Sequence, residues 1–147
     1  MTKKISKRLL EIVDALPIKN GMRILEIGCG PGVAAREIAN RIENVYVLAI
    51  DRSAKAIEQA IKNSQAEIKQ GRLKFIQSKI EEFELPENET LFDIAFAVRV
   101  GAFDGRHPEI ENEALRRTAK ALKKNGNFFI DTGNPLKEIP LDLYRNR

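Results

Sequence analysis

The chain has 147 residues, about one domain at roughly 150 residues per domain. With 43% hydrophobic and 31% charged residues it is typical of a globular protein, which excludes disorder as its main state. The longest apolar run, 45–50, is far short of the roughly 20 residues of a membrane span. The formal net charge is +4. We attribute it to solvated lysines on helix faces; the alternative, a face for nucleic acid, has weak support because aromatic residues are sparse.

The N-terminus and the single cysteine bear on location. No apolar segment follows the charged N-terminus, so no secretory signal is visible. Cys29 cannot form a disulfide within the chain, which favours a reducing compartment. We therefore expect a cytoplasmic protein without membrane attachment. One histidine and one cysteine cannot supply a usual zinc site, so no metal is expected.

Hydrophobic periodicity predicts helices and strands in alternation. A first helix spans about 5–16, with Thr2 as a candidate N-cap, and ends before Pro17. The predicted strands are 23–27, 45–50, 73–77, 93–98 and 127–131. The helices between them are 33–42, one from the Ser53 cap towards Gly71, one or two turns over 79–84, and 110–122 with Gly126 as its stop.

This alternation predicts an α/β protein: a Rossmann-like, doubly wound, mainly parallel sheet with helices on both faces. The sequence shows no repeat or linker, so we expect a single domain over 1–147. Ligands of such sheets bind beyond the carboxyl ends of the strands, where the strand order reverses. The first place to look is therefore the turn after the first strand, residues 28–32.

That turn is rich in glycine and reads Glu26-Ile27-Gly28-Cys29-Gly30-Pro31-Gly32. Glycines here let the backbone approach a ligand, and the next helix directs its N–H groups at it. A dinucleotide fingerprint places its third glycine one residue later, where this chain has Val33. The spacing therefore weakens the prediction of a pyrophosphate site. Cys29 is expected mainly as a small packing residue.

A carboxylate follows the second predicted strand. Asp51 stands directly after residues 45–50, where an acid can accept hydrogen bonds from both hydroxyls of a ribose. An acid in a turn is common on its own, but the combination with the glycine-rich turn favours an adenosine ligand.

These motifs resemble those of class I S-adenosylmethionine-dependent methyltransferases. Residues 26–32 match the family's first motif position by position, and the resemblance runs from the leading helix to the fifth strand. It implies a sheet of order 3-2-1-4-5-7-6 and S-adenosylmethionine as cofactor. The cofactor-binding residues that we carry over are Glu26, Gly28, Cys29, Gly30, Gly32, Asp51, Arg52, Ser78, Lys79, Ile80 and Val98.

The resemblance also assigns roles within this set. It places Glu26 on the methionine and sugar side, Asp51 on the ribose, and Arg52 beside the adenine. The turn 78–80 would meet the adenine ring; where many members carry an aspartate for the adenine amino group, this chain has Ser78.

The methyl acceptor is not identified by the sequence and would be a small molecule, RNA or protein. The Asn/Asp-Pro-Pro-aromatic motif of amino-methylating nucleic-acid enzymes is absent after the fourth strand. The loop 99–108 would face the acceptor, and its Asp104 and His107 are weak catalytic candidates.

The C-terminus departs from the family. Sixteen residues, 132–147, follow the fifth predicted strand, too few for the usual helix and last two strands. We therefore expect strands six and seven of the family's sheet to be missing and strand five to lie at or near an open edge. An apolar tail there favours a homodimer, with a folded-back monomer as the alternative. Two alternative functions remain open. The chain could be a non-catalytic adenosyl-binding module that needs a partner, or a nicotinamide-dependent oxidoreductase.

Overall fold

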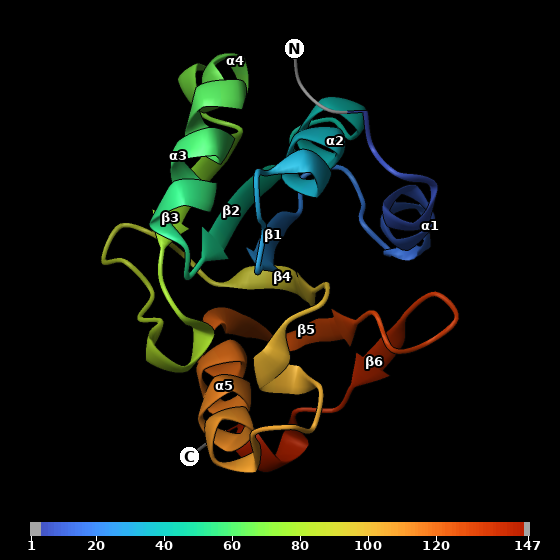
Figure 1. The fold of residues 1–147 in the computed structure, drawn as a ribbon, viewed down its shortest axis with the longest axis vertical. Coiled ribbons are helices and arrows are strands. Elements are labelled where there is room, and N and C mark those ends of the chain that lie inside the picture. The colour runs from blue at the N-terminus through green and yellow to red at the C-terminus, as the bar shows by residue number, and fades with distance from the viewer. Residues whose placement is uncertain (1–3, 146–147) are drawn as a thin grey trace.

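The computed structural model describes residues 4–145, and a six-stranded sheet of order β3-β2-β1-β4-β5-β6 forms its centre (Figure 1). The strands are β1 (Arg23–Ile27), β2 (Tyr46–Asp51), β3 (Leu73–Gln77), β4 (Phe92–Ala97), β5 (Leu122–Ile130) and β6 (Lys137–Ile139). The first five pair in parallel and β6 is antiparallel to β5. The strand order reverses between β1 and β4, so their carboxyl ends are the expected ligand position.

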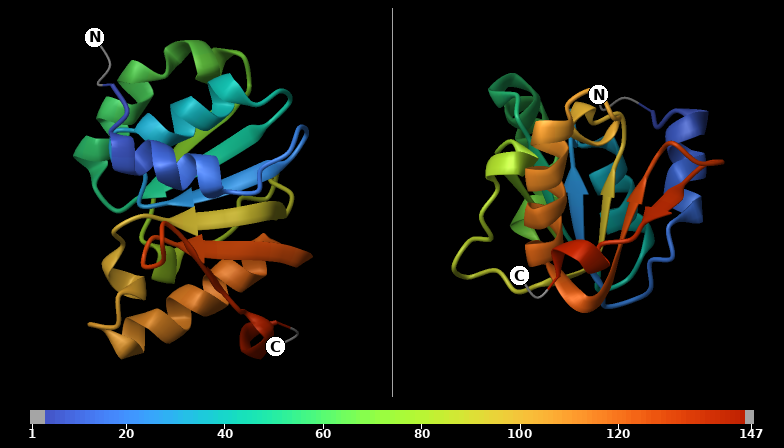
Figure 2. Two further views of the ribbon diagram at one scale, coloured as in Figure 1. Left: turned by 90° about the vertical axis from the view of Figure 1, so that its right-hand side faces the viewer. Right: turned by 90° about the horizontal axis from the view of Figure 1, so that it is seen from below.

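Helices cover both faces of the sheet. They are α1 (Lys7–Ala15), α2 (Val33–Arg41), α3 (Ala54–Asn63), α4 (Gln65–Lys69) and α5 (Pro108–Ala121), with 3₁₀ turns η1 (Ile80–Glu82), η2 (Gly101–Phe103) and η3 (Asp142–Tyr144). Figure 2 shows α1 and α5 on opposite sides of the sheet. The predicted doubly wound α/β fold is therefore confirmed. No helix within residues 4–145 is long and apolar enough to cross a membrane.

The central strands are apolar on both faces because both faces are covered. In β2, Val47 packs into the cluster under α1, α2 and α3, and its neighbour Leu48 packs into the cluster under α5. Ile24 and Leu25 divide in the same way in β1. Successive side chains of a strand point to opposite faces, so an uninterrupted apolar run serves both cores.

Two predicted element boundaries are wrong. The first helix begins after Ser6, whose Oγ accepts a hydrogen bond from the Leu9 N–H, and Thr2 lies outside the described residues. The last helix ends at Ala121, so Gly126 lies inside β5 instead of stopping the helix. Leu122 pairs with Phe92 there, and the gain from burying it in the core outweighs the helical character of the local sequence.

The tail after β5 folds back onto the chain. Ile139 in β6 pairs with Phe128, and Leu141 is only 2% exposed within the core under α5. Strand β5 thus lies one strand in from the edge of the sheet, and of the two outcomes considered for the tail the structure shows the folded-back one. A three-residue antiparallel strand needs far less chain than a helix with two strands, and it takes the place next to strand five where the resemblance puts strand seven.

Candidate active site

The glycine-rich turn after β1 is held by hydrogen bonds to the end of β2. The N–H groups of Gly28 and Cys29 donate to the Ile50 carbonyl at 2.8 and 3.0 Å. The Gly30 N–H donates to Oδ2 of Asp51 at 2.8 Å. The two sequence motifs predicted to form one site are thus in direct contact.

The glycines of this turn serve different ends. A Cβ at Gly28 would lie 2.5 Å from Cγ2 of Val100, and one at Gly32 would lie 2.8 Å from Cζ of Phe75, so both positions are closely packed. A Cβ at Gly30 would meet no atom within 4 Å, although its φ of +54° is in the left-handed region. The space over Gly30 is therefore open for a ligand that approaches the backbone.

Asp51 orders two backbone segments at once. Its Oδ2 accepts from Gly30, and its Oδ1 accepts from the Ser53 N–H at 2.8 Å. A carboxylate offers about four acceptor positions, so two remain for further donors such as a pair of ribose hydroxyls. The side chain also lines the larger cavity of the site.

Glu26 is a buried acid beneath the turn. It is 3% exposed, and its Oε1 has no hydrogen-bond partner among the described residues. Burial, helped by the negative charge of Asp51, raises the pKa of Glu26 to about 8. An unpaired acceptor at this place suits a ligand that brings a donor or a positive charge.

A cavity of about 530 Å³ opens at the carboxyl ends of β1, β2 and β4. Seven of the residues predicted as site residues line it: Gly28, Asp51, Arg52, Ser78, Lys79, Ile80 and His107. Four others, Glu26, Cys29, Gly30 and Gly32, belong to β1 and the glycine-rich turn and are not among the lining residues. Val98 packs instead against the core cluster under α1, α2 and α3.

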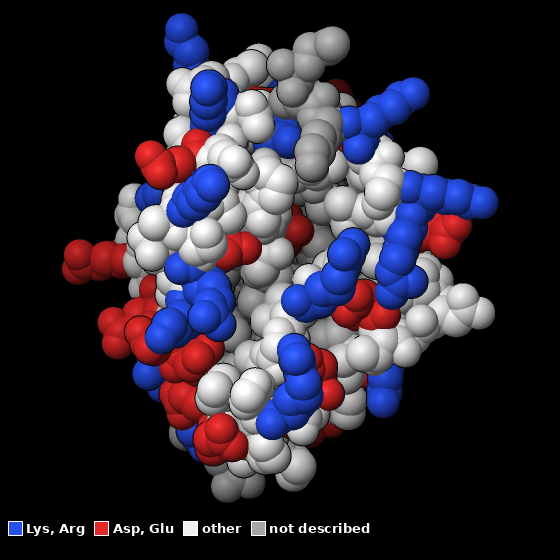
Figure 3. All heavy atoms as spheres, in the orientation of Figure 1, with Lys and Arg blue, Asp and Glu red and all other residues white. Residues whose placement is uncertain are grey.

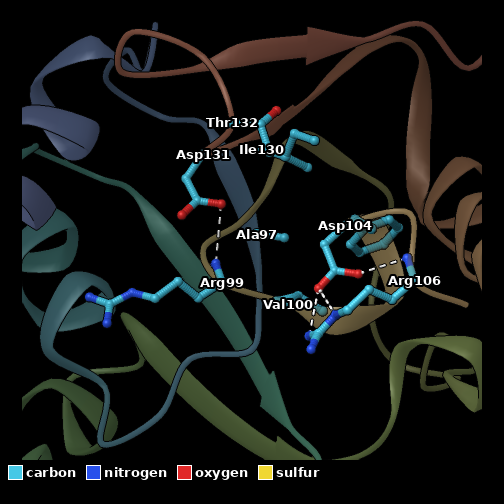
Figure 4. Close-up of a pocket in the computed structure, with 9 residues that line it drawn as sticks. Ala97, Arg99, Val100, Asp104, Arg106, Ile130, Asp131 and Thr132 are labelled. Carbon is cyan, nitrogen blue, oxygen red and sulfur yellow. Dashed lines mark hydrogen bonds and ion pairs between the residues drawn. The ribbon is translucent and has the colours of Figure 1, made fainter.

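A smaller cavity of about 320 Å³ lies over the ends of β4 and β5 (Figure 4). Its apolar wall consists of Ala97, Val100, Phe103 and Ile130, and its polar wall of Arg99, Asp104, Arg106, Asp131 and Thr132. Arg99, Val100 and Arg106 border both cavities, so the two spaces adjoin. The arrangement offers room for one ligand over β1 and β2 and a second over β4 and β5.

The two catalytic candidates lie at different cavities. His107 precedes α5 and lines the larger cavity. Asp104 lines the smaller one and pairs with Arg106 at 2.6 Å, and this hydrogen bond lowers the pKa of Asp104 below its usual value. A lowered pKa makes Asp104 a weak proton acceptor, so His107 is the better candidate for a base.

Cys29 is a packing residue, as expected. It is buried, and burial raises the pKa of its thiol, so it stays protonated and inert.

Sequence reasoning missed the polar wall over β5. Asp131 follows β5 directly and Asp51 ends β2, and this shared position at a strand end was the available signal. Its Oδ1 accepts from the Arg99 N–H at 3.2 Å, and its Oδ2 lies 3.6 Å from the guanidinium of Arg8. No sequence pattern indicated the positive φ of Arg99, +56°.

Comparison with known proteins places this arrangement in a family. A family model described as a methyltransferase domain matches residues 18–146. The chain belongs to this methyltransferase family. The family implies S-adenosylmethionine as cofactor, as the sequence predicted, and it sets aside the nicotinamide alternative.

Individual relatives differ in the acceptor that their names state. An O-methyltransferase of Aspergillus nomiae is 29% identical over 134 residues, which cover 88% of this chain and 56% of that protein. A sterol 24-C-methyltransferase of Gibberella zeae is 31% identical over 136 residues, 92% of this chain and 34% of that protein. The chain thus spans little more than half, or about a third, of these relatives.

Solved structures share the fold. A phosphoethanolamine N-methyltransferase of Haemonchus contortus, solved with S-adenosylmethionine, superposes with a TM-score of 0.67 at 25% identity, over 84% of this chain and 27% of that one. The Bacillus YcgJ protein superposes with a TM-score of 0.66 at 23% identity, over 84% of this chain and 49% of that one.

The residues present fit the family's cofactor. The open space over Gly30, the acceptor positions left on Asp51 and the unpaired Oε1 of Glu26 lie along the ends of β1 and β2. The adjoining cavity of about 530 Å³ is within the usual size range of small-ligand sites.

Proposed function

We propose that this chain transfers a methyl group from S-adenosylmethionine to an acceptor bound over β4 and β5. The observation that carries the proposal is the pair of adjoining cavities, one beside the glycine-rich turn and Asp51, the other beyond Arg99 and Val100. The acceptor would be a small molecule, RNA or protein, as the sequence left it. The single-domain organisation over 1–147 and the cytoplasmic location stay predictions.

The proposed roles of the cofactor-site residues follow from their positions. Asp51 would accept from the ribose hydroxyls while it holds the turn through Gly30. Arg52, Ser78 and Lys79 would border the adenine, with the buried Ile80 as an apolar wall. Glu26 would face the amino group of the methionine part.

The chain's contribution to the reaction would be mainly orientation. S-adenosylmethionine supplies a methyl group on a positively charged sulfur. Because the sulfur becomes a neutral thioether when the methyl group is transferred, it is a good leaving group without acid catalysis. Val100 borders both cavities and packs closely against the backbone of Gly28, where there is no room for a Cβ. This contact would hold the cofactor cavity and the acceptor cavity at a fixed distance from each other. Alignment of two reactants can lower a barrier by about 7–11 kcal/mol.

Proton removal matters only for an acceptor that carries a proton on its reacting atom. His107, which borders the larger cavity, and Asp104, which borders the proposed acceptor cavity, are the two candidates for this base. Asp104, held by Arg106, is the weaker candidate.

The test is transfer of label from S-adenosylmethionine labelled in its methyl group. The full chain is incubated with separate small-molecule, RNA and protein fractions at a limiting cofactor concentration, and Asp51→Asn, which should bind the cofactor more weakly, serves as the matched control. Label that enters one fraction with the wild type only supports methyl transfer. Normal cofactor binding without transfer to any fraction would favour the alternative, a non-catalytic adenosyl-binding module that needs a partner.

A further inference from the structure

Arg99 stands at the boundary of the two cavities. It follows β4 and borders both of them. Its backbone N–H donates to Asp131, but among residues 4–145 its guanidinium has no hydrogen-bond or ion-pair partner. In Figure 4 the side chain extends away from the Asp104–Arg106 pair. An exposed, unpaired guanidinium at a ligand cavity is available to bind an anion.

Two other cations near the smaller cavity, Arg8 and Arg106, already have acidic partners. In the face shown in Figure 3, Lys and Arg side chains lie on both sides of a central hollow. Arg106 pairs with Asp104 at 2.6 Å, and Arg8 lies 3.6 Å from Asp131. Arg52 has no ion-pair partner among residues 4–145, but it borders only the larger cavity, on the side proposed for adenine. Arg99 is therefore the cation that the smaller cavity offers to a ligand.

The backbone at Arg99 is held in an uncommon conformation. Its φ of +56° lies in the left-handed region, which residues with a side chain rarely adopt. The hydrogen bond from its N–H to Oδ1 of Asp131, 3.2 Å long, fixes this conformation against the end of β5. Residues held in such uncommon backbone conformations cluster at active sites and ligand-binding loops.

The smaller cavity itself limits the kind of ligand. Its volume of about 320 Å³ suits a small molecule, and four of its nine lining residues are apolar. Phe103 of this wall packs edge to face against the buried Phe128, with ring centroids 4.9 Å apart. A ligand with a small apolar body and an acidic group matches this wall and the neighbouring guanidinium.

We propose that Arg99 binds the carboxylate or phosphate of a small-molecule methyl acceptor whose apolar body occupies the cavity of Figure 4. This inference rests on the proposed function, because it takes the larger cavity to hold the cofactor. A guanidinium recognises both anions by paired N–H donors, so carboxylate and phosphate share the same site chemistry.

The experiment uses the full chain saturated with S-adenosylhomocysteine. Benzoate, phenyl phosphate and the neutral benzamide are titrated and followed by NMR. We expect at least one of the two acids to bind fivefold or more tightly than benzamide, and the tighter acid identifies the preferred anion. Arg99→Gln should abolish this preference. Lys69→Gln, which removes an exposed charge on α4, should keep it.

Four results would overturn the inference. Two concern the wild type alone: it binds the acids and the amide equally, or it binds none of the probes. In the third, the preference for acids survives in Arg99→Gln. In the fourth, a short RNA displaces the acids from the wild type. A fifth is specific to the cofactor: Arg99→Gln would weaken S-adenosylhomocysteine but not 5′-methylthioadenosine, which lacks the carboxylate. Arg99 would then hold the cofactor. Failure of the wild type to bind S-adenosylhomocysteine would instead count against the proposed function.

Discussion

At the scale of single residues, the carboxylate of Asp51 has an observed structural role and a proposed role in cofactor recognition. It holds the glycine-rich turn through Gly30 and the start of α3 through Ser53. Asp51→Asn keeps one oxygen that can accept but loses the charge. Because a hydrogen bond to a charged group contributes about 1.5–3 kcal/mol, we expect S-adenosylmethionine affinity to fall about 10- to 100-fold.

Calorimetry measures that loss, and Ser53→Ala is the matched control. It removes the hydroxyl that accepts from the Ala56 N–H at 3.1 Å, which should cost about 1 kcal/mol of stability and leave affinity unchanged. A folded Asp51→Asn variant with wild-type affinity would remove Asp51 from the cofactor site.

Gly30 tests the open space over the turn. Valine at this position would have to adopt a φ of +54° and would place a branched side chain in that space. We expect Gly30→Val to lose cofactor binding. Gly71→Val is the control, since Gly71 also has a positive φ of +76° and open surroundings but lies between α4 and β3. It should lose stability only. Equal cofactor affinities of Gly30→Val and Gly71→Val would show that the cofactor does not bind over Gly30.

Glu26 predicts a pH dependence. Its pKa is about 8 in the folded chain against 4.5 for an ordinary glutamate, so the folded state binds more protons between these values. The free energy of unfolding should therefore fall as the pH rises from about 5 to 8. Glu26→Gln should reduce this fall by a few kcal/mol in urea titrations of the ligand-free chain, whereas the exposed Glu58→Gln should not change it. Parallel curves for wild type and Glu26→Gln would show that the buried acid does not titrate in this range.

At the scale of elements, Arg36 of α2 bridges the glycine-rich turn and the start of α4 with two hydrogen bonds. Arg36 in α2 donates to the Pro31 carbonyl at 2.8 Å and to Oγ of Ser64 at 2.9 Å, and Ser64 is fully buried. Ser64→Ala leaves a buried donor without its acceptor, which should cost about 1–3 kcal/mol in urea denaturation. Lys69→Ala on the exposed side of α4 should change stability by less than about 0.5 kcal/mol. Equal stability of both variants would mean that the buried bond contributes nothing.

Elements were predictable where local signals and packing agree. β3 spans the predicted residues 73–77, and Ser53 caps α3 as expected. The boundary between α5 and β5 was not predictable, because Lys123 and Lys124 are typical of a helix end while the pairing of Leu122 with β4 is a distant contact. The residues around Leu122 do not indicate that it pairs with a strand 30 residues earlier in the chain.

The site shows the same division. Asp51 and the glycine-rich turn could be predicted because each function requires a particular residue type at a particular spacing. The contact of Val100 with the Gly28 position and the backbone conformation of Arg99 depend on how β4 packs beside β1. The second cavity is formed by these distant contacts, so the sequence did not reveal it.

At the scale of the whole molecule, the tail closes the core. Leu141 is 2% exposed, whereas Leu143, two residues on, is 73% exposed. Leu141→Ala should cost about 2–5 kcal/mol of stability, and Leu143→Ala less than about 0.5 kcal/mol. Urea denaturation compares them. Equal small effects would show that the tail does not pack on the core in solution.

The homodimer stays a prediction, but the structure removes most of the exposed apolar surface that suggested it. The apolar residues that suggested an uncovered tail pack on the same chain, apart from Leu143. Sedimentation of the full chain decides between a folded-back monomer and a dimer.

The central claim is that the carboxyl ends of β1 and β2 form a site for the adenosyl cofactor. Calorimetric titration of the full chain with S-adenosylmethionine, S-adenosylhomocysteine and NAD tests it most directly. The account predicts that the two adenosyl ligands bind one to a chain, that Asp51→Asn weakens both, and that NAD does not compete. A folded chain that binds neither adenosyl ligand, or binds NAD more tightly, would contradict it.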